Sequence, residues 1–374
     1  MEWVKLGDIA IIHDGKRVPL NNTQRLEKST NPIYPYYGAN GIVDYINDYI
    51  FDKELPILCI AEDGGNWGLK ENCSYIIKEK CWVNNHAHVI TFIDDYNLDY
   101  INYYLNYSDL NKYITGTTRG KLTQKELKNI VIPNVSLEIQ NKIVNKLKNI
   151  ETLIQTRKGQ IQALDDLVDS VFYEILNKNE QSFVYINDVI EKKPEKLSNK
   201  DNEPISYFDI SSIDNQVHKF TSENIILNSD DRPSRAKQII ENGDILLSTV
   251  RPNLKNIAYF NYNYTYNPIG STGFVVLRPK TDIINPMYLF QIVISNEFTN
   301  SLMSIASGAS YPAVKESDVR KLKVPLIPLD QQNKFASLVE KIEDQKEILN
   351  NSLRELADLF DCLMQDAFDG FLIK

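Results

Sequence analysis

The sequence predicts an α+β protein built from two related domains and two long helices that pair antiparallel. One stretch of the chain recurs at a constant offset, which indicates an internal repeat. Each copy ends in a proline-free stretch whose apolar residues alternate at spacings of four and three, typical of a paired helix. Short apolar runs between Gly, Asn, Asp and Pro clusters fill the remainder and indicate strands and turns.

The repeat is clearest near the end of each copy. Gly116–Pro133 aligns without a gap on Gly308–Pro325, and the register continues into the following helix, where Gln140 falls on Gln332. The beginnings of the two copies also correspond, since Val4–Ile9 resembles Val184–Val189. The chain is therefore expected to contain two copies of one structural plan.

The strands of both copies are expected within short apolar runs. These are residues 56–60 and 89–93 in the first copy, and residues 244–250 and 273–277 in the second. The domain boundaries follow from the composition: residues 1–135 and 179–328 form the two mixed α+β domains, and residues 136–178 and 329–374 form the two helices.

The two helices are expected to form a coiled-coil rod with a pseudo-two-fold axis between the domains. Nine of ten seam positions in each helix are apolar, and Arg157 and Lys346 are the exceptions. Ser136 is a plausible N-cap for the first helix. Long basic side chains reaching out of the seam explain the exceptions better than contacts with another subunit.

Composition excludes several classes of protein. The 374 residues are 43% hydrophobic and 24% charged, so disordered, collagen-like and disulfide-rich proteins are excluded. No apolar stretch is long enough to cross a bilayer, and no secretory signal is recognisable, so a cytoplasmic protein is expected. The four cysteines lack metal-binding spacing, which predicts reduced thiols and no metal. The net charge of −9 comes largely from the last helix and neither supports nor excludes nucleic acid.

No nucleotide-binding or catalytic signature is present, and no catalytic residue is predicted. Asn31-Pro-Ile-Tyr34 departs from the methyltransferase pattern, and His86 and His88 lack a third metal ligand in the sequence. The informative clusters are instead polar, aromatic and glycine-bearing. Asn, Arg, Ser, Thr and backbone amides read base edges and bind phosphates, so these clusters predict DNA contacts. The residues are Tyr37, Asn40, Asn66, Asn85, Arg119, Lys121, Arg232, Ser234, Arg235, Ser248, Thr249, Arg251, Asn253 and Tyr311.

With these motifs in view, the chain resembles the specificity subunit of type I restriction-modification enzymes over almost its whole length. The resemblance is carried by a Pro–Leu–Gln pattern before each helix, and by stretches of both domains. Those stretches are Tyr37–Gly41, Glu62–Gly64, Asn84–His86, Thr118-Arg119, Pro233–Ala236 and Gly243–Arg251. One departure is that Ser310-Tyr311 replaces Thr118-Arg119, which puts a DNA contact by that loop of the second copy in doubt.

The resemblance implies that each domain is a target-recognition domain for one half of a split, non-palindromic DNA site. It also implies assembly with two modification subunits and with restriction subunits, which use S-adenosylmethionine, ATP and Mg and carry out adenine methylation and cleavage. This chain itself is expected to hold no cofactor. Modification subunits are expected to dock on the outward faces of the helices, and the alternative is that the repeated residues there simply start the helices. Those residues are Gln140, Asn141, Lys142, Gln332, Asn333 and Lys334.

Two alternatives remain open at this point. The recognition subunit of a related two-part, type II-like restriction enzyme would have the same architecture but a different catalytic partner. A coiled-coil scaffold that binds only proteins would leave the polar loops without a role and would have no affinity for DNA.

Overall fold

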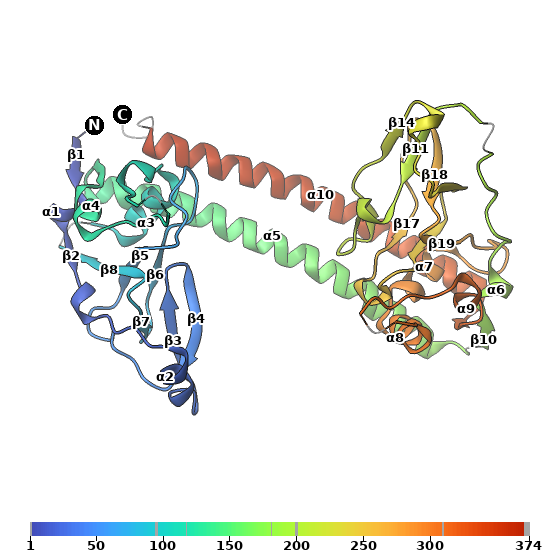
Figure 1. Ribbon diagram of the computed structural model, residues 1–374, viewed down its shortest axis with the longest axis horizontal. Coiled ribbons are helices and arrows are strands. Elements are labelled where there is room, and N and C mark those ends of the chain that lie inside the picture. Colours follow the sequence, from blue (N-terminus) through green and yellow to red (C-terminus); the bar gives the residue numbers. More distant parts are fainter. Residues whose placement is uncertain are drawn as a thin grey trace. The chain divides into compact units, whose positions relative to one another are not determined.

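The computed structural model describes residues 2–93, 96–116, 118–180, 182–198, 201–308 and 310–369 (Figure 1). Internal packing divides the chain into two compact units. The first unit comprises residues 1–159 together with 351–374, and the second comprises residues 160–350. Each of the two long helices begins in one unit and ends in the other, because the divisions at 159 and 350 fall inside them.

The first unit contains three small sheets and several short helices before its long helix. Its helices are α1 (Leu6–Ile9), α2 (Asn22–Glu27), α3 (Leu98–Tyr107), α4 (Gln124–Asn129) and the start of α5 (Leu137–Lys178), with 3₁₀ turns at Asp14–Lys16 and Asn111–Tyr113. Its strands are β1 (Glu2–Lys5), β2 (Ala10–Ile12), β3 (Tyr34–Gly38), β4 (Gly41–Ile46), β5 (Ile57–Ala61), β6 (Ser74–Ile77), β7 (Trp82–Val83), β8 (Ala87–Phe92) and β9 (Val131–Asn134).

The second unit repeats this plan with additional strands. Its helices are α6 (Ile186–Val189), α7 (Pro286–Ile294), α8 (Asn296–Ile305), α9 (Glu316–Val319) and the start of α10 (Leu329–Phe368), with 3₁₀ turns at Ile210–Ser212, Ser229–Asp231 and Pro252–Leu254. Its strands are β10 (Ser182–Tyr185), β11 (Ile205–Phe208), β12 (Ile213–Asp214), β13 (Lys219–Phe220), β14 (Asn224–Ile226), β15 (Ala236–Ile239), β16 (Ile245–Ser248), β17 (Ile257–Tyr259), β18 (Asn267–Ser271), β19 (Phe274–Leu277) and β20 (Lys323–Leu326).

In each unit a sheet with a central, fully buried strand supports the loops considered below. The first unit has the strand order β2-β8-β5-β6, and the second has β17-β16-β19. β5 pairs antiparallel with β8, and β16 pairs antiparallel with β19. A second sheet has the strand order β4-β3-β7 in the first unit and β14-β11-β18-β15 in the second, and the other strands form two-stranded sheets, namely β1-β9, β10-β20 and β12-β13. The expected strands are therefore confirmed.

The two units repeat the same strand pairing and the same hydrogen bond at the start of their long helices. β1 pairs with β9 and β10 pairs with β20, so that Trp3 faces Pro133 and Phe183 faces Pro325. The carbonyl of each of these prolines accepts a hydrogen bond from a tyrosine hydroxyl, that of Tyr100 or Tyr288. The Pro–Leu–Gln pattern thus marks the place where a short strand and a helix of each domain are attached to its long helix.

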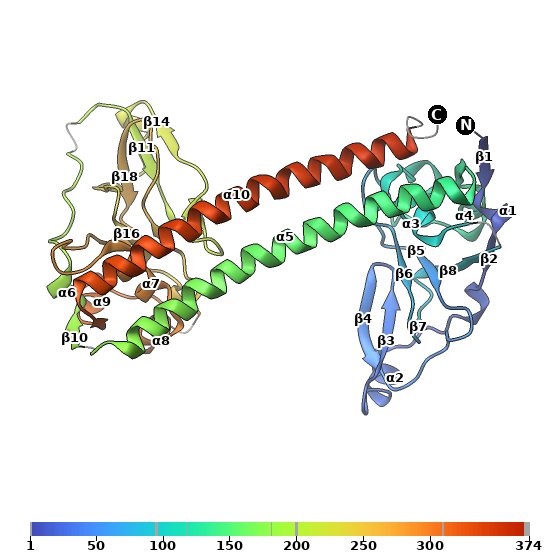
Figure 2. The same cartoon turned by 180° about the vertical axis from the view of Figure 1, so that it is seen from behind.

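Within each unit the two long helices run antiparallel. In the first unit, Ile143 and Leu147 near the start of α5 share a core with Met364 and Phe368 near the end of α10. In the second unit, Phe172 near the end of α5 packs on Phe335 near the start of α10, with 5.7 Å between ring centroids. Figure 2 shows the same pairing of opposite helix ends within each unit.

The helix starts and one seam exception are explained by local bonds. Ser136 accepts a hydrogen bond from the Ile139 amide at 3.5 Å, as expected for an N-cap. Lys346 does not reach out of the seam but pairs with Asp165 of α5 and Glu343 of α10, at 2.6 and 2.7 Å. A half-buried cation in a seam needs such partners, and the sequence pattern did not reveal them.

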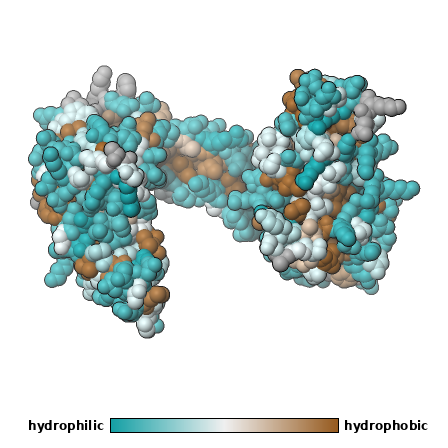
Figure 3. All heavy atoms as spheres, in the orientation of Figure 1, coloured by the Kyte–Doolittle hydropathy of each residue, from teal (hydrophilic) through white to brown (hydrophobic). Residues whose placement is uncertain are grey.

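No helix among the described residues is long and apolar enough to cross a membrane. The visible face of the first unit is largely hydrophilic, with scattered apolar residues (Figure 3).

Candidate nucleic-acid interface

Two loops of the first unit meet beyond the end of β5. We call them the first loop pair: residues 62–66, and residues 115–121 without 117, which lies outside the described residues. Asp63 forms a β-bridge with Lys121, and Lys121 is also bridged to Thr115. The Leu122 amide donates to the Glu62 carbonyl at 2.8 Å, which continues the pairing. Loops far apart in the sequence are thereby held as one rigid edge.

The predicted cations of the first loop pair are held by carboxylates. Arg119 Nη2 lies 3.1 Å from Asp63 Oδ1, and Lys121 Nζ lies 2.9 Å from Glu62 Oε1. The Arg119 side chain is 67% exposed, so most of its donors face solvent. Asp63 also accepts from His86 Nδ1 at 2.6 Å. Both cations are therefore presented on the surface by partners that a phosphate could replace.

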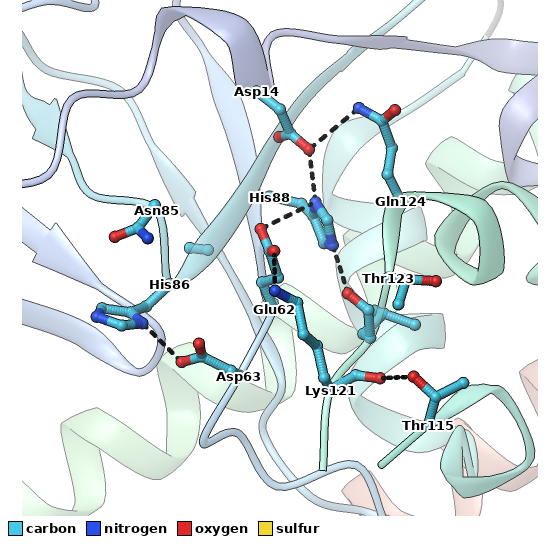
Figure 4. A network of polar contacts seen from close by, with 12 residues as sticks. Asp14, Glu62, Asp63, Asn85, His86, His88, Thr115, Lys121, Thr123 and Gln124 are labelled. Atoms are coloured by element: carbon cyan, nitrogen blue, oxygen red, sulfur yellow. Dashed lines mark hydrogen bonds and ion pairs between the residues drawn. The ribbon is translucent and has the colours of Figure 1, made fainter. Parts of the chain in front are cut away.

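A polar network lies beneath the first loop pair (Figure 4). Buried His88 places Nδ1 2.6 Å from Asp14 Oδ2 and Nε2 2.7 Å from the Leu122 carbonyl. Arg17 donates to Glu62 at 2.7 Å and to the Ala87 carbonyl at 2.7 Å. The network thus connects β8, the turn after β2 and the loop that precedes α4. Neither Asp14 nor Arg17 belongs to a sequence motif, so sequence reasoning missed them.

Asp14, Glu62 and His88 bring one potential metal-ligand atom each within 4.8 Å of one another. Sequence reasoning found no third ligand for the pair His86 and His88. The structure groups His88 with two carboxylates, and His86 is not part of this cluster. However, His88 Nδ1 faces the Asp14 carboxylate and Nε2 faces the Leu122 carbonyl, so both ring nitrogens already have hydrogen-bond partners. Arg17 forms ion pairs with both carboxylates, and Lys121 forms a second ion pair with Glu62. The residues fit a salt-bridge network better than a metal site.

The network changes the pKa values of its carboxylates. Burial raises the pKa of Asp14, but hydrogen bonds from His88 and the Val89 amide, with the charges of His88 and Arg17, outweigh burial and hold it below 3.8. Burial likewise raises the pKa of Glu62, and hydrogen bonds from Arg17 and Lys121 overcome it and hold it below 4.5. Both carboxylates are therefore ionised at neutral pH.

Replacing Asp14 by alanine is expected to destabilise the first unit by about 1–3 kcal/mol, because buried His88 loses its acceptor. A carboxyl with a depressed pKa stabilises the fold above its unfolded-state pKa, and this contribution is lost as the pH falls through the lower folded-state pKa. The difference between Asp14→Ala and the parent should thus shrink below pH 3.8. Urea unfolding at several pH values measures this difference in the free energy of unfolding. Gln124→Ala, which removes only a 3.3 Å exposed bond to Asp14, is the control.

Two loops of the second unit meet in the same way. We call them the second loop pair: residues 248–253, and residues 307–313 without 309, which lies outside the described residues. Val250 forms a β-bridge with Ala313, and Ala313 is also bridged to Ser307. The Val314 amide donates to the Thr249 carbonyl at 2.9 Å. The guanidinium of Arg251 lies over the Tyr311 ring, 4.3 Å from its centroid.

The remaining predicted DNA contacts differ in how available their side chains are. Asn40 donates to the Gly64 carbonyl at 3.0 Å and so joins the first loop pair. Tyr37 is buried and stacked on Tyr75, while Arg232 donates to the carbonyls of Asp201 and Glu203. Ser248 and Thr249 donate to backbone carbonyls of their own unit. Exposed side chains are those of Asn40, Asn66, Asn85, Arg119, Lys121, Ser234, Arg235, Asn253 and Tyr311.

The residues predicted to contact partner subunits divide into internal and exposed groups. Gln140 and Gln332 are buried and accept from the amides of Asn97 and Asn285, both at 2.8 Å. Asn141 and Asn333 accept from the side chains of the same two asparagines. These contacts attach the start of each long helix to the N-cap residue of α3 or α7 in its own unit. Lys142 and Lys334 are exposed, and each pairs with an acidic residue one turn earlier on its own helix.

A family model described as the type I restriction modification DNA specificity domain matches the chain twice, over residues 1–165 and 179–357. The chain belongs to this family. Specificity subunits are the part of type I restriction-modification enzymes that recognises the DNA sequence, and this chain is such a subunit. The two matches coincide with the internal repeat described above.

Several relatives of this specificity subunit are similar over most or part of the chain. A Haemophilus influenzae protein assigned as the type I restriction enzyme specificity subunit S.HindORF215P is 24% identical over 95% of this chain and 90% of its own length. The S subunit of a type I system from M. genitalium matches 98% of this chain and 96% of its own, with a TM-score of 0.59 and 14% identity, a likeness of fold. The HsdS subunit of Thermoanaerobacter tengcongensis matches 50% of this chain and 47% of its own, with 34% identity and a TM-score of 0.41.

Proposed function

We propose that this subunit reads a split, non-palindromic DNA site, one half with each unit, and directs adenine methylation and DNA cleavage by partner subunits. The observation that carries the proposal is the repeat in its three-dimensional form. Each unit closes two distant loops into one edge through the same pair of bridges, and each edge carries a guanidinium group. Two such edges in one chain suit two recognition points on one long ligand.

We further propose that this chain is the non-catalytic subunit and that two modification subunits and restriction subunits hold S-adenosylmethionine, ATP and Mg. The carboxylate and histidine groups brought together in the first unit support this assignment, since their hydrogen bonds and ion pairs already satisfy them. A general base or a metal ligand would need a free electron pair facing a substrate. Lys142 and Lys334 remain candidates for contacts with the modification subunits.

Co-expression with the modification subunit tests the proposal. Adenine methylation across a test genome, mapped by single-molecule sequencing, is expected to occur at one split motif. Omission of this chain is expected to abolish that methylation. A stable, cofactor-binding complex that methylates no split motif would contradict the proposal.

A further inference from the structure

The two loop pairs can be matched residue by residue through their hydrogen bonds. In the first unit the Glu62 amide donates to the His86 carbonyl at 2.8 Å, and in the second the Thr249 amide donates to the Gly273 carbonyl at 2.9 Å. The bridges from Asp63 to Lys121 and from Val250 to Ala313 follow one residue later. Gly64 of the first unit therefore occupies the place of Arg251 in the second.

The backbone at these two matched positions has a positive φ in both units. Gly64 has a φ of +66°, which suits a glycine, whereas Arg251 has a φ of +50° and a ψ of 60°. A side chain in this region is strained, and such strain concentrates at functional sites. The Arg251 amide donates to the Pro312 carbonyl at 2.7 Å, which helps to hold the strained residue against the opposite loop.

The second loop of each pair, residues 115–121 in the first unit and 307–313 in the second, also matches. The arginine, however, comes from this loop in the first unit and from the other loop in the second. Gly116 and Gly308 both have a φ of +96°, and the repeat places Tyr311 where the first unit has Arg119. In the first unit the arginine comes from this loop, and its Nη2 lies 3.1 Å from the position a Cβ on Gly64 would take. In the second unit the arginine comes from the matched position of the other loop and lies over Tyr311.

We infer that Arg119 and Arg251 are equivalent DNA contacts, and that Asp63 and Tyr311 are the residues that position their guanidinium groups. The inference rests on the proposed function and deepens it. Each loop pair presents one guanidinium between its two loops, supplied from opposite loops in the two units. The replacement of Arg119 by Tyr311 in the repeat therefore moves the contact to the facing loop and does not remove it.

The two positioning residues act by different physical means. Asp63 accepts from Nη2 of Arg119, and among the described residues no other hydrogen bond engages the exposed guanidinium, whose remaining donors suit phosphate or guanine. Tyr311 offers a ring face to the Arg251 guanidinium, which has no hydrogen bond from its N–H groups to any residue that the structure describes. The phenolic hydroxyl is not needed for this, so a phenylalanine could replace the tyrosine.

The test uses the complex with its modification subunits and a duplex that carries the mapped site. Arg251→Gly suits the left-handed backbone, so the variant is expected to fold and assemble while its DNA affinity falls about 10-fold. Arg119→Gln is expected to have a similar effect. Lys323→Ala removes another exposed cation from an aromatic ring, 5.3 Å above Tyr185 in the same unit, and serves as the matched control with unchanged affinity.

Double variants distinguish positioning from a general structural role. Tyr311→Ala is expected to weaken binding as much as Arg251→Gly does, and Tyr311→Phe is expected to restore it. Because Tyr311 acts through Arg251, the combination Arg251→Gly with Tyr311→Ala should be no weaker than Arg251→Gly alone. Asp63→Ala should likewise add nothing to Arg119→Gln.

Two outcomes would overturn the assignment while leaving the proposed function intact. One is parental affinity in Arg251→Gly, and the other is full additivity in the double variants. Absence of sequence-specific binding by the unsubstituted complex would instead overturn the proposed function, and this assignment with it.

Discussion

Replacing Phe368 by alanine is expected to destabilise the first unit by about 3–5 kcal/mol, the cost of removing a large buried aromatic side chain. Phe368 is only 4% exposed. Its ring lies 5.5, 5.4 and 5.7 Å from the rings of Tyr100, Tyr104 and Tyr107 of α3. The residue belongs to the end of α10 but completes the core of the unit that contains the start of the chain.

Tryptophan fluorescence during denaturant unfolding measures this effect selectively. The three tryptophans, Trp3, Trp67 and Trp82, all lie in the first unit, so their signal reports on that unit alone. Leu359→Ala, a truncation of a 44% exposed residue on the same helix, is the control and is expected to change stability by less than about 1 kcal/mol. An unchanged fluorescence midpoint for Phe368→Ala would show that α10 does not complete this core.

If the two long helices set the unspecified gap between the two halves of the proposed split DNA site, removing one heptad from both helices is expected to shorten that gap by about three base pairs. Seven residues correspond to about 10 Å of helix and to a rotation within about 20° of two full turns. DNA rises about 3.4 Å per base pair. Residues 152–158 of α5 and 351–357 of α10 are suitable, because they adjoin the division between the units and are mostly exposed. Methylation mapping of the variant gives the new gap.

Matched deletions show whether the length and the rotational phase of the helices determine the gap. Removing four residues from each helix shortens it by about 6 Å but turns its far end by about 40°, so methylation of any split motif is expected to fall strongly. Removing the heptad from α5 alone breaks the pairing of the helices and is expected to prevent assembly. If the double heptad deletion kept the parental gap, the helices would not set the spacing.

The architecture could be predicted because the sequence contains two copies of the same structural plan. The match of Gly116–Pro133 to Gly308–Pro325 and the apolar seam of the helices can both be recognised in the sequence alone. The long helices and the buried strands that they predict are confirmed. The bridge of Lys346 to Asp165 could not be predicted, since it depends on the register between two helices. Periodicity alone leaves that register open.

The candidate site could be predicted only in part, because its charges interact across large sequence distances. The clusters around Glu62, Arg119 and Arg251 stood out as polar and glycine-bearing, and they do lie on paired loops. Asp14 and Arg17 gave no signal, since a lone acidic or basic residue near a turn is usually solvated. The alignment of Arg119 with Tyr311 suggested that the second unit lacks the DNA contact of this loop. The arginine of the second unit, Arg251, lies on the facing loop, and the sequence alignment did not show this.

The position of the last turn of α10 in the first unit has a consequence for synthesis of the chain. Residues 160–350 leave the ribosome before Phe368, so the second unit can fold while the first still lacks part of its core. Until then the aromatic face of α3 that Phe368 covers stays open to water. A chaperone that shields such a nascent surface would therefore act on the first unit for longer, even though that unit is made first.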